Sequence, residues 1–93
     1  MPSLADKFMQ RRVDYGLRLV ELQQGLSIAS EEERATLIEE VETIAHNLAG
    51  TAAMFGQRSL GEQAAEAEDN LKAKPENGSA WIDDLIDALG RAA

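Results

Sequence analysis

The only histidine of the 93-residue chain, His46, lies in a segment rich in small side chains, residues 45–56. On a helix, residues three, four and seven apart share a face, so Ala49, Gly50 and Ala53 are expected beside the imidazole. An imidazole can exchange a proton, bind a metal ion or act as a nucleophile. Small neighbours would leave room for another molecule to approach the ring.

The apolar residues of the same segment repeat with helical spacing on a different face, which predicts that His46 points to solvent. These apolar positions are Leu37, Val41, Ile44, Leu48, Ala52 and Phe55. Gly50 is unusual because a glycine inside a helix costs about 1 kcal/mol relative to alanine. It either clears space for a partner protein near the ring or allows a tight contact between helices.

Several reactions of a lone histidine do not fit the chain. A hydrolytic triad needs a serine and a further orienting group that the sequence does not place beside His46. No glycine-rich phosphate loop is present, so direct use of ATP is not expected. Carboxylate-bridged metal bundles carry Glu-x-x-His on two inward faces, whereas Glu42 and His46 have Glu-x-x-x-His spacing on an outward face. We therefore expect no metal site.

Covalent phosphorylation of the imidazole is the reaction that remains. A neutral imidazole has a nitrogen lone pair that can attack an activated phosphoryl group on another protein and later return it. Glu42 is expected to hold the second ring nitrogen of His46.

The composition narrows the partners and the compartment. The chain has 9 basic and 17 acidic residues, a net charge of −8, and no cysteine. An acidic surface disfavours nucleic acid and anionic membranes. No apolar run approaches the ~20 residues of a membrane span, and no signal peptide is recognisable. These features predict a cytoplasmic protein that binds neither nucleic acid nor membrane.

Four segments have the apolar period of amphipathic helices, at about residues 4–26, 31–54, 59–73 and 79–91. Ser3, Ser30, Ser59 and Ser79 are the expected N-caps, and Gly56 is available for a left-handed C-cap. Short connections between amphipathic helices favour antiparallel neighbours. The prediction is an all-α, up-down-up-down four-helix bundle that forms a single domain over residues 1–93, with the histidine on the second helix.

The first helix has a second apolar edge, formed by Met9, Val13, Leu17 and Val20. This edge either widens the face that packs on the core or stays exposed for a partner. Counting from the turns at 1.5 Å per residue places residues 67–69 of the third helix, and Arg11 and Arg12 of the first, at the level of His46.

The sequence from His46 to Gly56, His-Asn-Leu-Ala-Gly-Thr-Ala-Ala-Met-Phe-Gly, followed by Leu60 and Ala64, resembles the signature of histidine phosphotransfer (HPt) domains. The resemblance implies that His46 is the phosphoacceptor and Gly50 the clearance residue. It implies a phosphocarrier without kinase activity or a cofactor of its own, which takes a phosphoryl group from one receiver-domain aspartate and passes it to another. The receiver would supply Mg²⁺. The implied partners are response-regulator receiver domains, with a hybrid histidine kinase as one candidate, and a monomer is expected.

One position departs from the family pattern. HPt domains commonly have a lysine three residues after the histidine, and this chain has Ala49 there. Arg11, Arg12 and Lys72 are the candidates for the missing cation, and replacing both arginines is expected to slow transfer without unfolding the bundle. The residues expected to contact the partner are Met9, Val13, Ala49, Ala53, Met54 and Glu68. Because of Ala49, a non-catalytic helical adaptor that binds a receiver domain or a partner helix stays open as an alternative.

Overall fold

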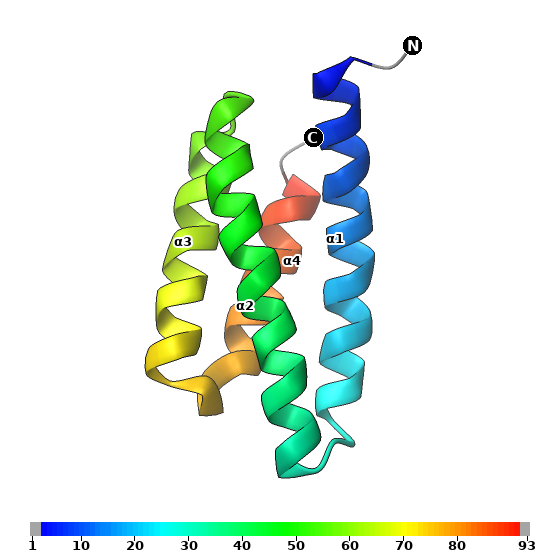
Figure 1. Ribbon diagram of the computed structural model, residues 1–93, viewed down its shortest axis with the longest axis vertical. Coiled ribbons are helices and arrows are strands. Elements are labelled where there is room, and N and C mark those ends of the chain that lie inside the picture. Colours follow the sequence, from blue (N-terminus) through cyan, green and yellow to red (C-terminus); the bar gives the residue numbers. More distant parts are fainter. Residues whose placement is uncertain (1–2, 92–93) are drawn as a thin grey trace.

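The computed structural model describes residues 3–91, which form four α-helices and one short 3-10 turn (Figure 1). The elements are α1 (Leu4–Leu26), α2 (Glu31–Met54), α3 (Arg58–Ala73), η1 (Pro75–Asn77) and α4 (Gly78–Arg91). Consecutive helices run in opposite directions, with the α2–α3 turn at one end and the other two connections at the opposite end (Figure 1). The predicted all-α antiparallel bundle is confirmed.

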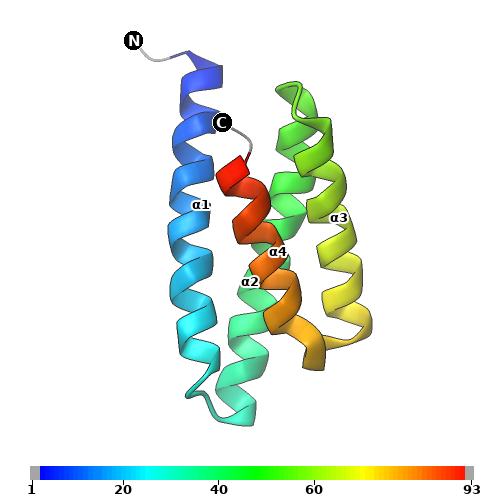
Figure 2. The same ribbon diagram turned by 180° about the vertical axis from the view of Figure 1, so that it is seen from behind.

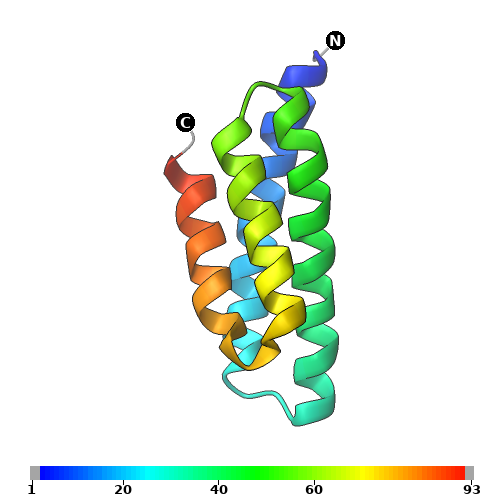
Figure 3. The ribbon, with the colours of Figure 1, turned by 90° about the vertical axis from the view of Figure 1, so that its left-hand side faces the viewer.

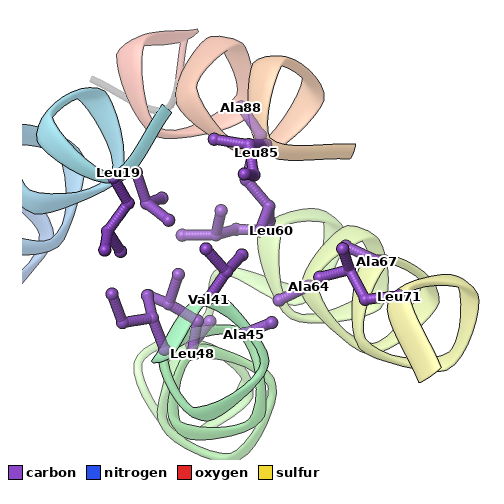
Figure 4. Close-up of a cluster of buried hydrophobic side chains, with 14 of the residues drawn as sticks. Leu19, Val41, Ala45, Leu48, Leu60, Ala64, Ala67, Leu71, Leu85 and Ala88 are labelled. Carbon is purple, nitrogen blue, oxygen red and sulfur yellow. The ribbon is translucent and has the colours of Figure 1, made fainter. Parts of the chain in front are cut away.

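Each helix packs mainly against two neighbours, α2 and α4 also touch across the bundle, and the most extensive contact is between α2 and α3 (Figures 2 and 3). The apolar faces of all four helices meet in one core, to which Leu19 of α1, Leu48 of α2, Leu60 of α3 and Leu85 of α4 contribute (Figure 4). The largest fully buried side chains are Leu19, Leu22, Val41, Leu48, Leu71, Ile82 and Leu85. The second apolar edge of α1 is exposed instead of packing into this core.

Two of the four predicted N-caps are correct. The Ser3 side chain accepts from the Asp6 backbone N–H in a capping box, and the Ser30 side chain accepts from the Glu33 backbone N–H. Ser59 does not cap α3, because that helix already begins at Arg58 and Gln57 occupies its N-cap position without a side-chain bond. Ser79 does not cap α4, because η1 leads directly into a helix that starts at Gly78.

The turn between α2 and α3 is closed by backbone hydrogen bonds. Gly56 has a φ of +75°, the left-handed conformation that glycine adopts at low cost. Gln57 N–H donates to the Ala52 carbonyl at 2.9 Å and Gly56 N–H donates to the Ala53 carbonyl at 3.3 Å. This pair of bonds is a Schellman motif, which satisfies two carbonyls at the end of α2 and reverses the chain within a few residues.

No helix within residues 3–91 combines the length and apolarity that crossing a membrane requires.

Arg12 is the one buried charged residue among the described residues, with 5% of its surface exposed. Its Nη2 donates to the Leu89 carbonyl oxygen at 2.7 Å, and its Nη1 contacts Met9 Sδ at 3.4 Å. Leu89 lies in the last turn of α4, where unpaired carbonyls carry partial negative charge. The guanidinium therefore joins α1 to the C-terminal end of α4.

This position corrects the prediction that Arg12 supports a phosphoryl group on His46. A guanidinium bonded to α4 inside the bundle is not available to a group on the solvent face of α2. Because Arg12 is buried and bonded to α4, we also expect its replacement to lower stability, unlike replacement of Arg11.

We predict that Arg12→Ala lowers the free energy of unfolding by about 2–3 kcal/mol, because it removes a charged hydrogen bond and leaves the Leu89 carbonyl without its donor. Arg11→Ala is the matched control. It removes the same charge from an exposed neighbouring position and should change stability by no more than about 0.5 kcal/mol. Urea unfolding followed by circular dichroism measures both variants, and equal effects would contradict the role given to Arg12.

Candidate functional site

His46 lies on the solvent face of α2, and 73% of its side chain is exposed. Gly50, one turn further along the helix, is also exposed, and a Cβ built there would meet no atom within 4 Å. The tight helix contact considered for Gly50 is therefore ruled out. The open surface beside the ring agrees with the alternative, clearance for an approaching molecule.

The close contact between helices occurs at Gly61 of α3. A Cβ at this position would lie 3.4 Å from the Ala49 carbonyl oxygen and 3.6 Å from the Ala53 backbone nitrogen. An added Cβ would therefore be in van der Waals contact with the α2 backbone, which shows how closely α2 and α3 approach each other here. Two turns further along α3, this approach brings Glu68 within reach of His46.

Glu68 binds the imidazole. His46 Nδ1 lies 3.1 Å from Glu68 Oε2 and 3.2 Å from Oε1. An ionised carboxylate only accepts hydrogen bonds, so Nδ1 carries the proton, and in the neutral ring the lone pair is then on Nε2. Glu68 thus sets both the tautomer and the orientation of a ring that is otherwise exposed.

Lys72 binds the same carboxylate from the next turn of α3. Its Nζ donates to Glu68 Oε2 at 3.0 Å. Partial burial of Glu68, whose side chain is 14% exposed, raises the pKa of its carboxyl, but hydrogen bonds from Lys72 and His46 outweigh burial and hold the pKa below its ordinary value. The pKa of Lys72 is raised, mainly by its hydrogen bond to Glu68.

Counting residues from the α2–α3 turn correctly predicted which part of α3 lies opposite His46. The carboxylate that bonds to the imidazole was not predicted correctly. Residues 67–69 were expected opposite His46, and Glu68 lies there. The ring partner was expected to be Glu42, four residues before His46. The sequence could have identified Glu68, because it is a carboxylate within the segment of α3 that was expected to lie opposite His46.

The α1 candidates do not gather around His46. Asn47 Nδ2 donates to the Tyr15 hydroxyl at 3.5 Å, so Tyr15 is the residue of α1 that lies at the same height in the bundle as His46. The exposed Arg11 lies one helical turn away from Tyr15. Val13 is two residues, or about 200°, from Tyr15 around the helix. Together with Met9, it lines a groove between α1 and α4.

The α2 candidates remain close to His46. Gly50, Ala53 and Met54 are exposed, whereas Ala49 is half-buried against α3. Small side chains beside the ring and one large apolar side chain, Met54, form a surface that another protein could contact. Within residues 3–91, no three His, Asp or Glu side chains are grouped so that they could hold a metal ion.

The family model described as the Hpt domain matches residues 14–92, which include the second half of α1 and all of α2, α3, η1 and α4. The searches of curated proteins and of solved structures each return no match.

We predict that Lys72→Met raises the pKa of Glu68, because the variant loses the donor that stabilises the charged carboxylate. The native pKa lies below the ordinary value, so this ion pair stabilises the fold at a pH above the ordinary carboxyl pKa, and the stabilisation is lost as the pH falls through the depressed pKa. An NMR titration of the Glu68 side-chain carbonyl carbon measures the shift. An unchanged pKa in the variant would show that Lys72 does not interact with Glu68 in solution.

Proposed function

Because the chain belongs to the Hpt domain family, whose members carry out histidine phosphotransfer in phosphorelays together with receiver domains, we propose that His46 is its phosphoacceptor. The observation that supports this assignment is the pairing of an exposed imidazole with a carboxylate on Nδ1, which leaves the Nε2 lone pair for attack. His46 is also the only histidine of the chain.

In the proposed reaction, Nε2 attacks the phosphorus of an aspartyl phosphate on a receiver domain. The P–N bond forms while the bond from phosphorus to the aspartate oxygen breaks, and the aspartate leaves as a carboxylate. Nδ1 keeps its proton, so the phosphorylated ring gains positive charge, which Glu68 stabilises at 3.1 Å. Attack by the aspartate of a second receiver reverses these steps and restores the lone pair on Nε2.

We assign Lys72 the role of the cation that Ala49 does not supply. Lys72 is exposed and is held by the carboxylate that orients His46. A phosphoryl group on the ring would add negative charge next to Glu68, and an ammonium ion at this point offsets the repulsion between the two. Arg11 is less well placed, because it lies one turn from the level of His46 on α1.

The surface that receives the partner is proposed to consist of His46, Gly50, Ala53 and Met54. Receiver domains are the partners, and one of them belongs to a hybrid histidine kinase or to a response regulator. Mg²⁺ is expected from the receiver, which needs a cation for its own phosphorylated aspartate.

The first test is phosphoryl transfer from a phosphorylated receiver domain, measured as label that is stable to base and labile to acid. Wild-type protein should take up label and His46→Ala none. Lys72→Met should slow transfer about tenfold, since loss of one charged hydrogen bond in the transition state is worth about 1.4 kcal/mol. Lys74→Met, which removes an exposed lysine at the end of α3, is the matched control and should transfer at the wild-type rate.

Label on His46→Ala would refute the assignment of the phosphoacceptor. Binding of receivers without any transfer to the wild type would instead favour the adaptor.

A second prediction concerns the space above Gly50. Gly50→Ala should raise the free energy of unfolding by about 1 kcal/mol, because alanine is the better helix former and its methyl group meets no atom. The same methyl group should slow transfer at least about tenfold, since small misplacements of reacting groups have large effects on rate. A stabilised variant with wild-type transfer kinetics would contradict the clearance role.

A further inference from the structure

A second surface, unconnected with His46, lies between α1 and α4. The apolar edge of α1 is exposed along three turns, with 56% of Val13 and 62% of Leu17 accessible. Met9, Val13, Leu17 and Val20 line one side of a groove of about 410 Å³, and Ile86 and Leu89 of α4 line the other. We call this surface the α1–α4 groove. Exposed apolar patches of this kind on small proteins are commonly interaction sites.

The groove and the His46 face are on different sides of the molecule. Tyr15 and Arg18 of α1 bond to Asn47 and Glu40 of α2, whereas Gly16 and Leu17 line the groove beside α4. A partner in the groove would therefore leave the imidazole accessible.

Both edges of the groove are acidic. On α1, Asp14 and Glu21 lie three residues before and four residues after Leu17, so they flank it along the helix surface. On α4, Asp83 bonds to Gln23 of α1, and Asp87 follows one turn later on the same face. Arg12 also lines the groove, but its guanidinium is buried and bonded to the Leu89 carbonyl. Arg18, further along α1, is bonded to Glu40 and Glu21.

We propose that the α1–α4 groove binds an amphipathic helix with basic flanks, contributed by another protein. The apolar positions from Met9 to Val20 extend over about 16 Å at 1.5 Å per residue, the length of three helical turns. A helix laid in the groove would bury apolar side chains between α1 and α4 and place its lysines or arginines over the acidic edges. A second copy of this chain fits less well, because it would bring two acidic edges together and each chain has a net charge of −8.

The probe for this test is a synthetic peptide of about 18 residues, five turns of helix, with leucines along one face and lysines on both flanks. A control peptide has the same composition in an order that distributes the leucines around the helix. Anisotropy of the labelled peptides measures binding, and the amphipathic peptide is expected to bind with a dissociation constant in the micromolar range.

Leu17→Asp should weaken this binding at least about tenfold, because it places a charge in the centre of the apolar contact. The matched variant is Ile28→Asp, which adds the same charge at a side chain that is 88% exposed in the α1–α2 connection. It should leave binding within about twofold of the wild type. Circular dichroism verifies that both variants are folded.

Equal binding of the two peptides, or binding that Leu17→Asp leaves unchanged or strengthens, would show a general attraction between opposite charges and overturn the proposal. No binding of the amphipathic peptide would overturn it as well. Sedimentation should show a monomer, and a dimer that Leu17→Asp dissociates would assign the groove to a second copy instead. None of these results depends on phosphotransfer, which Leu17→Asp should leave unchanged.

Discussion

The close approach of α2 and α3 at Gly61 is the constraint on which the site depends. A Cβ added at Gly61 would already touch the Ala49 carbonyl oxygen at 3.4 Å, an ordinary van der Waals contact, so the two backbones are close enough for small residues to pack between them. Buried alanines continue the same interface, among them Ala45 on α2 and Ala64 on α3. Because the two helix axes are close, the side chain of Glu68 reaches His46 directly, with 3.1 Å between Oε2 and Nδ1.

Much of this fold follows from the apolar period of the sequence. The ranges of α1 and α2 match those predicted, because each begins at a serine that caps it and ends at a clear loss of the period. The two later helices each begin one residue early, since tight turns with their own backbone bonds replace the serine caps. Periodicity alone could not show that one apolar edge of α1 stays outside the core, because that depends on where α4 crosses α1.

Features of the site that depend on residue spacing within one helix could be predicted from the sequence. Features that depend on contacts with neighbouring helices were harder to predict. The outward direction of His46 and the open surface at Gly50 follow from the helical repeat of α2. Arg12 shows the limit of that approach. A polar residue at a core-facing position of α1 looks like a surface charge in the sequence, and its actual role requires the end of α4, 77 residues away in the chain, to lie beside it.

The turn at Gly56 has a consequence for how this chain can vary in length. His46 and Glu68 belong to one hairpin, and the number of residues between them sets the rotation of α3 relative to α2. One inserted residue would turn the following helix by about 100° and advance it by about 1.5 Å, which would move the carboxylate away from the ring. An insertion in the connection from Ser27 to Ser30 would disturb the pairing of Arg18 with Glu40, but it would leave the number of residues between His46 and Glu68 unchanged.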